Sequence, residues 1–143
     1  MAAADNLDRV IEQYHQAADE FSRGNPDPVK NLYSRRDDVA IANPFFPLTR
    51  GREQVVQRLE RAVQNFRDGE VGFQNVVQWV GGELACIVEL EEWRTKVGGG
   101  EDVTPFTLRV TTLFRSEEGE WKVVHRHADP ITTARTSESV IPE

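Results

Sequence analysis

The last apolar segment of the chain carries the side chains with the clearest capacity for chemistry. His125 and His127 are two positions apart, and Asp129 follows at the same spacing. Because side chains alternate across a strand, these three residues share one face of an extended segment with Trp121 and Val123. That face is the more apolar of the two, and we expect it to point into the protein interior.

Two imidazoles and a carboxylate on one strand face permit three interpretations. They could form a proton relay against a substrate, because histidine titrates near neutral pH. They could supply metal ligands, although no third and fourth ligand stand out beyond the acidic segment 89–92. They could also be structural, with His127 bonded to a neighbouring element and His125 closing a pocket wall. We keep His125, His127 and Asp129 as candidate catalytic residues and expect no metal and no cofactor.

Tyr14 is the other candidate with a reactive group. It falls on the apolar face of a segment with helical periodicity, where a phenol needs a hydrogen-bond partner. Aromatic side chains are expected to line an apolar cavity beside it and to contact a small apolar ligand: Phe21, Tyr33, Phe45, Phe46 and Trp93. The same residues would serve equally well as ordinary core.

Helices must position Tyr14 and its neighbours in the first half of the chain. Apolar residues recur at helical spacing over residues 7–21 and 55–66, and Asn25 followed by Pro26 predicts the start of a short helix between them. Residues 38–42 predict a brief strand. Residues 43–47 combine two phenylalanines with two prolines, which indicates a break in regular structure.

Strands must position the histidines in the second half. Residues 71–80, 84–97, 103–115 and 120–129 are rich in β-formers and are separated by glycine-containing turns. Short turns between consecutive strands predict an antiparallel meander, and long strands of this kind coil. We therefore expect an α+β fold in which a curved antiparallel sheet wraps around three helices, followed by a loose tail over residues 130–143.

Size and charge restrict the class of protein. A chain of 143 residues is expected to form one domain, residues 1–143, and its net charge of −7 opposes binding to nucleic acid. Cys86 is the single cysteine, so an intramolecular disulfide is excluded. No apolar run is long enough to cross a bilayer, and we expect a cytoplasmic protein that does not bind membranes.

The order of these elements and two short motifs resemble the SnoaL-like branch of the NTF2-like superfamily over residues 6–129. The motifs are Gly51-Arg52-Glu53, which opens the helix near residue 55, and the stretch GEWKVVHRH at residues 119–127. The resemblance implies a cone-shaped α+β barrel with a deep pocket at its open end. It also implies a homodimer formed through the outer face of the sheet. It leaves the activity open, because this fold serves many functions.

Ketosteroid isomerase, within the same superfamily, offers a specific comparison. Tyr14 stands where that enzyme carries its donor tyrosine, but Asn43-Pro44 replaces the Asp-Pro pair that supplies its base. An amide cannot accept the proton at neutral pH, so Asn43 could only orient a ligand. The second acidic donor would fall near Val110 or Thr112 and is absent. Steroid isomerisation is therefore disfavoured.

Two hypotheses follow from these residues. In the first, the protein binds a small, apolar, carbonyl-bearing metabolite and could isomerise, cyclise or dehydrate it, with a histidine as base and Tyr14 as donor. In the second, it is a non-catalytic module that binds a ligand or forms dimers. We expect Arg109, Arg126 and the acidic segment 89–92 to lie outside the pocket.

Overall fold

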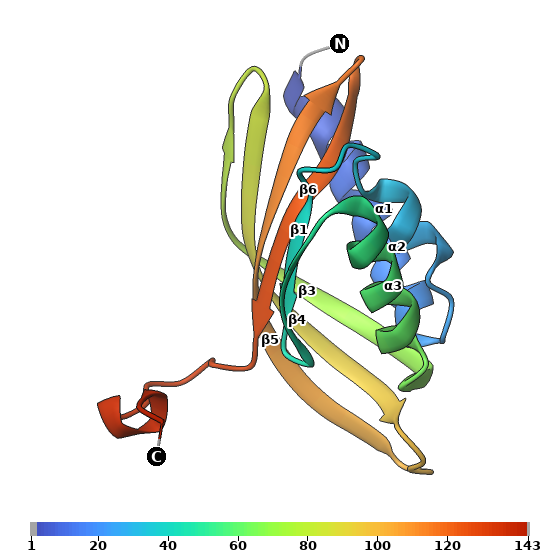
Figure 1. Cartoon of the computed structure of the whole chain (residues 1–143), viewed down its shortest axis with the longest axis vertical. Coiled ribbons are helices and arrows are strands. Elements are labelled where there is room, and N and C mark those ends of the chain that lie inside the picture. The colour runs from blue at the N-terminus through green and yellow to red at the C-terminus, as the bar shows by residue number, and fades with distance from the viewer. Residues whose placement is uncertain (1–2, 143) are drawn as a thin grey trace.

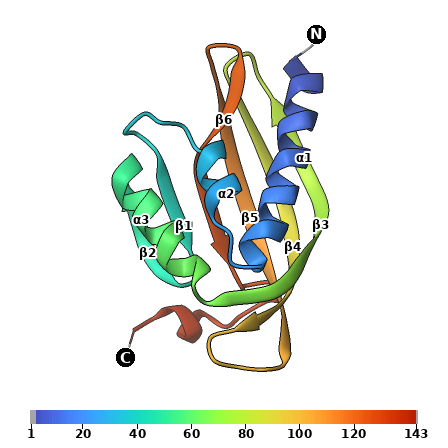
Figure 2. The ribbon, with the colours of Figure 1, turned by 90° about the vertical axis from the view of Figure 1, so that its right-hand side faces the viewer.

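The computed structural model describes residues 3–142 of the chain. One six-stranded sheet runs in the order β2-β1-β6-β5-β4-β3, and the helices cover its concave face (Figures 1 and 2). The sheet is open, because β2 and β3 form two separate edges. The predicted α+β fold, with three helices packed in a curved sheet, is confirmed.

The three helices are α1 (Ala3–Ser22), α2 (Asp27–Leu32) and α3 (Arg52–Val63). Gly24 follows α1 with a φ of 97°, a conformation that glycine adopts without strain and that ends the helix. The apolar face of α1 is buried as its periodicity predicts. The third helix is shorter than predicted, because the backbone turns at residues 64–65 and Phe66 already belongs to a strand.

The strands are β1 (Ala40–Asn43), β2 (Phe46–Arg50), β3 (Phe66–Val80), β4 (Leu84–Val97), β5 (Val103–Glu117) and β6 (Glu120–Asp129). The bounds of β4 and β6 match the prediction, and β3 to β6 form the expected antiparallel meander. Two features were not predicted. The chain resumes as β2 directly after the Asn43 turn, and β1 joins β6 in parallel, so the sheet is mixed.

A β-bulge in β6 decides which side chains face the helices. Leu113 pairs with His125, but the next residue of β5, Phe114, pairs with Val123, so β6 carries one extra residue at that point. Trp121 and Val123 are buried before the bulge, and Arg126 and Ala128 are buried after it. The alternation of faces therefore reverses within the strand.

The prediction that His125, His127 and Asp129 point inward is wrong for this reason. A bulge moves every later side chain of the strand to the opposite face of the sheet. All three residues follow the bulge, and they lie on the outer face while Arg126 takes the inner one. The inner face of β6 therefore presents the guanidinium of Arg126 to the predicted pocket instead of the two imidazoles.

Residues 130–142 leave the sheet and lie apart from the body of the protein, where they include the short 3-10 turn η1 (Ser137–Val140) (Figure 1). The looseness of this tail remains a prediction. Within residues 3–142, none of the helices combines the length and apolar character needed to cross a lipid bilayer.

Candidate functional site

An apolar cavity lies between the helices and the inner face of the sheet. Its volume is about 40 Å³, and four of its lining residues, Phe21, Asn43, Phe45 and Trp93, were predicted as ligand contacts. Apart from these and the polar residues described below, the walls are apolar: Ala18, Val29, Pro44, Leu59, Ala62, Phe66, Phe106 and Leu108. The cavity therefore offers an apolar surface over most of its wall.

Arg126 forms the centre of the polar wall. Its side chain is 10% exposed and is held by a bidentate ion pair, in which Nη1 and Nη2 each donate to one oxygen of Glu91 at 2.8 Å. Its Nε donates to Oδ1 of Asn43 at 3.1 Å. Such a network fixes the guanidinium plane, because every bond is directed by the planar fork of the side chain.

Glu91 is fully buried on β4 and is stabilised as a carboxylate. Besides the two bonds from Arg126, it accepts a bond from the indole Nε1 of Trp93 at 3.0 Å. Burial alone would raise the pKa of Glu91, but the charge and hydrogen bonds of Arg126 outweigh it and hold that pKa below its usual range. Glu91 in turn raises the pKa of Arg126 against the effect of burial. The pair is ionised, and its two charges compensate each other.

Tyr14 reaches this network from α1. Nη1 of Arg126 donates to its hydroxyl oxygen, and Oγ1 of Thr112 lies 3.4 Å away. Burial raises the pKa of Tyr14 despite the opposing charge of Arg126, so the phenol keeps its proton at neutral pH. A hydroxyl that accepts a bond from a cation is a stronger donor through its own proton. Tyr14 is therefore a polarised hydrogen-bond donor at the cavity wall.

Asn43 completes the polar wall at the end of β1. Its Oδ1 is occupied by Arg126, which leaves the two N–H groups of its amide as donors. Among the described residues that line the cavity, none is Asp, Glu or His. The polar wall thus presents hydrogen-bond donors to the cavity and lacks a side chain that could accept a proton at neutral pH.

The histidines of β6 make their contacts on the outer face. Nδ1 of His125 lies 2.9 Å from the carbonyl oxygen of Ala40 on the neighbouring strand. His127 is 55% exposed, and its Nε2 lies 3.1 Å from Asp129, which also pairs with Arg109 at 2.6 Å. The predicted outward position of Arg109 is confirmed. None of the four residues lines the cavity.

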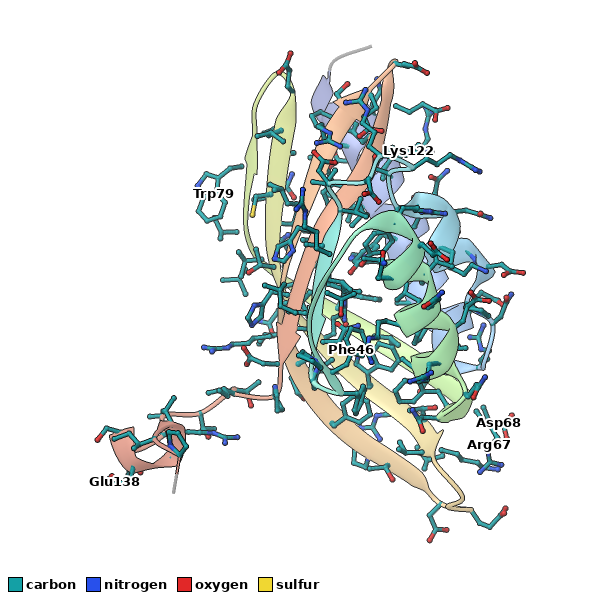
Figure 3. All side chains as sticks on the ribbon, viewed as in Figure 1. Phe46, Arg67, Asp68, Trp79, Lys122 and Glu138 are labelled. Carbon is teal, nitrogen blue, oxygen red and sulfur yellow. The ribbon has the colours of Figure 1, made fainter. Side chains whose placement is uncertain are left out.

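Two other predicted ligand contacts also lie outside the cavity wall. Tyr33 is buried at the end of α2, and its hydroxyl has no hydrogen-bond partner among the described residues. Burial raises the pKa of that phenol. Phe46, labelled in Figure 3, begins β2 and is covered by Arg58 of α3, whose guanidinium carbon lies 5.6 Å from the ring centre.

Sequence reasoning missed the buried charges. We expected Arg126 and the acidic segment 89–92 on the outside, but Glu89 and Glu91 are buried and only Glu92 of the three glutamates is exposed. Glu89 bonds His15 of α1, with 2.8 Å between Oε2 and Nε2. One pattern pointed to this arrangement: Ile87, Glu89, Glu91 and Trp93 share a strand face, and an acidic residue on an apolar face needs a buried cation.

Comparison with known proteins identifies the family and the fold. The family model described as SnoaL-like domain matches residues 7–132. No curated protein sequence is similar enough to this chain to be matched.

Solved structures share the fold at low identity. An NTF2-like superfamily protein from Salmonella enterica serovar Typhimurium has a TM-score of 0.79 at 15% identity, covering 94% of each chain. A ketosteroid isomerase-like protein from Erwinia carotovora atroseptica has a TM-score of 0.73 at 16% identity, covering 90% of this chain and 96% of the other. An NTF2-like protein of unknown function from Pseudomonas putida has a TM-score of 0.65 at 20% identity, covering 90% and 88%. At such identities these likenesses establish the fold alone.

Proposed function

Because the chain belongs to the SnoaL-like domain family of the NTF2-like superfamily, we propose that it binds a small, largely apolar molecule in its cavity and holds an oxygen atom of that molecule through Tyr14. One observation carries this proposal: the polar wall of an otherwise apolar cavity consists of hydrogen-bond donors. Such a wall favours a ligand that carries a hydrogen-bond acceptor. A buried donor that the ligand leaves without a partner costs about 1 to 3 kcal/mol of binding free energy.

The charges beside the cavity favour a neutral acceptor. Arg126 is neutralised by the bidentate bonds to Glu91, so the wall carries little net charge. A carboxylate guest would bring an uncompensated negative charge close to Glu91. A ketone or aldehyde oxygen accepts the bonds from Tyr14 and Asn43 without that penalty, and its hydrocarbon part fits the apolar wall.

The size of the cavity limits the guest. About 40 Å³ is room for a few water molecules and is well below the roughly 150 Å³ of a cavity that binds benzene, so a ring-sized guest requires the cavity to widen. Phe45 lies at the mouth, 53% exposed, with its ring centre 5.7 Å from that of Phe66. Rotation of this exposed ring is the simplest route to a larger opening, because exposed side chains change rotamer rapidly.

Isomerisation, cyclisation or dehydration of the guest is the second candidate. The polarised hydroxyl of Tyr14 favours it, because such a donor stabilises an oxygen on which negative charge develops. Proton abstraction, however, requires a base, and the histidine assigned that role in the first hypothesis lies on the outer face. Binding without chemistry therefore has the stronger support, and turnover would require a base carried by the substrate or by water.

A calorimetric screen tests the proposal. Small cyclic ketones are titrated into the wild type, into Tyr14→Phe and into His127→Ala, with thermal shift as a second readout. We expect at least one ketone to bind the wild type, Tyr14→Phe to weaken it about tenfold, and His127→Ala to leave it unchanged. Binding that depends on His127 and not on Tyr14 would contradict the assignment.

A homodimer formed through the sheet and a cytoplasmic location also remain predictions. The surface expected to contact a second copy is the outer face of the sheet. An assembly module without a ligand is the corresponding alternative function. It would bind none of the ketones while still forming a dimer, so the same calorimetric screen separates the two.

A further inference from the structure

His15 of α1 and Glu89 of β4 form a buried ionisable pair outside the apolar cavity. Neither residue lines that cavity. The side chain of Glu89 is 1% exposed and that of His15 is 27% exposed, and Nε2 of His15 lies 2.8 Å from Oε2 of Glu89. The other carboxyl oxygen, Oε1, is buried and has no hydrogen-bond partner among the described residues. The carboxyl group of Glu89 therefore depends on a single imidazole.

This dependence makes the charge of the imidazole important. A buried carboxylate that accepts one hydrogen bond from a neutral donor keeps an uncompensated charge, which is strongly unfavourable in the interior. An imidazolium donates the same bond and also supplies the opposite charge. Glu91, the neighbour of Glu89 on the same strand face, differs because Arg126 donates to both of its oxygens. For Glu89, charge compensation requires a proton on His15.

The surroundings of His15 favour the imidazolium. Its ring is stacked on Phe73 of β3, with 3.7 Å between the ring centroids and 15° between the planes, and an aromatic face attracts a cation. The titratable and charged groups around His15 come from three elements, namely Glu89 and Glu91 of β4, Glu12, Tyr14 and Asp19 of α1, and Arg126 of β6. Because Arg126 is compensated by Glu91, the acidic groups predominate.

The pair is adjacent to the residue that serves the cavity. Tyr14 precedes His15 on α1, and the centroids of the two rings are 6.4 Å apart. α1 lies over the sheet beside β3 and β4 (Figure 2). One turn further along the helix, Oδ1 of Asp19 accepts a bond from the Val71 N–H at 2.8 Å. The contact with Glu89 therefore fixes the part of α1 that carries Tyr14.

We propose that His15 and Glu89 form a proton-dependent anchor for α1, and that this anchor regulates ligand binding through the position of Tyr14. When His15 releases its proton to solvent, which its partly exposed ring reaches, the Glu89 carboxylate stays buried without a counter-charge. That state favours movement of α1 away from β4, and Tyr14 moves with the helix. The anchor therefore stabilises the fold most at low pH, and its contribution falls as pH rises through the range in which histidine titrates. The regulatory part rests on the proposed ligand binding.

Urea unfolding of the full chain between about pH 6 and pH 9 tests the anchor without a ligand, because exposed carboxylates stay ionised over this range. Glu89→Gln keeps the shape of the side chain and an acceptor oxygen for His15 but removes the buried charge. His127→Gln is the matched control. His127 is 55% exposed and pairs with Asp129 at 3.1 Å on the outer face, where solvent screens the interaction.

The unfolding equilibrium constant of the wild type is expected to rise about tenfold or more over this pH range relative to that of Glu89→Gln. His127→Gln is expected to follow the wild type. His15→Gln should be more destabilising at the acidic end than at the alkaline end, whereas a purely structural contact would give the same loss at both. Parallel profiles for the wild type and Glu89→Gln, or a slope that His127→Gln removes, would overturn the proposal.

Calorimetric titration with cyclopentanone at both ends of the pH range tests the regulation. Burial raises the pKa of Tyr14, so its phenol keeps its proton throughout. We expect the affinity of the wild type for the ketone to fall about threefold or more as pH rises, and that of Glu89→Gln to stay constant. Equal wild-type affinities at both ends would refute the regulation. A chain that binds no ketone at either pH would overturn the proposed function together with its regulation, whereas the unfolding experiment tests the anchor alone.

Discussion

Replacing Glu91 by glutamine is the substitution that most sharply tests the buried ion pair. Glutamine keeps the shape of the side chain and one acceptor oxygen, but its amide N–H groups face the guanidinium of Arg126, which has no acceptor to offer. One of the two 2.8 Å bonds is lost, and the cation remains buried without a counter-charge. Trp93 also loses a charged acceptor for its indole N–H.

The magnitude follows from the burial of the pair. Removing one partner of a buried ion pair costs about 3 to 5 kcal/mol, and glutamine retains enough hydrogen bonding to place the cost near the lower end. We therefore expect Glu91→Gln to lower the free energy of unfolding by about 3 kcal/mol and the Tm by about 10 °C. Glu92→Gln is the matched control, since Glu92 is exposed and its replacement is expected to change stability by less than about 0.5 kcal/mol.

Urea unfolding followed by tryptophan fluorescence measures both variants, because Trp93 lies in the network itself. Combining Glu91→Gln with Arg126→Met should recover about 2 kcal/mol relative to the sum of the single changes, since the double variant removes both charges of the pair. If Glu91→Gln unfolds within about 1 kcal/mol of the wild type, the pair is not buried as described.

Three further predictions concern acid stability, the outer face and a close backbone contact. The folded pKa of Glu91 lies below its unfolded value of about 4.3, so its contribution to stability is complete above that value and is lost as pH falls through the folded pKa. Urea midpoints measured on acidification should therefore fall less steeply for Glu91→Gln, and an unchanged slope would refute the assignment. His127→Ala should change the free energy of unfolding by less than about 0.5 kcal/mol, and a larger loss in urea unfolding would mean that its ring is packed in the interior. Gly69→Ala should cost about 1 to 3 kcal/mol in the same assay, because a Cβ there would lie 2.6 Å from Thr95 and 2.8 Å from Ser22, and a neutral result would show that β3 can move away from α1.

The helices, the long strands and their order were predictable because periodicity reports local geometry directly. Tyr14 and Phe21 lie in the interior as expected, because both fall on the single apolar face of a helical segment. The parallel pairing of β1 with β6 was not predictable in this way. It depends on contacts between segments about 85 residues apart in the chain, such as Ala40 with His125.

The prediction of the catalytic residues failed because the register of β6 against β5 shifts by one residue. The bulge at Val123 and Val124 has no distinctive sequence pattern, since both residues are β-branched and would fit either face. Because of this bulge, Arg126 lines the cavity, and His125 and His127 lie on the outer face. Glu91 was misplaced for a related reason, because both faces of β4 contain apolar residues and alternation alone could not choose between them. Both of these errors concern the facing of a strand and not its existence.

The claim that Tyr14 holds the ligand oxygen is tested most directly by a thermodynamic cycle in which the Tyr14 hydroxyl and the ligand carbonyl are removed singly and together. A small cyclic ketone and the hydrocarbon of the same ring size are titrated calorimetrically into the wild type and into Tyr14→Phe. We predict that the wild type binds the ketone about tenfold more tightly than the hydrocarbon, and that Tyr14→Phe abolishes this preference while leaving hydrocarbon affinity unchanged. If Tyr14→Phe lowers the affinity for both ligands equally, or if it still prefers the ketone, Tyr14 does not hold the guest oxygen.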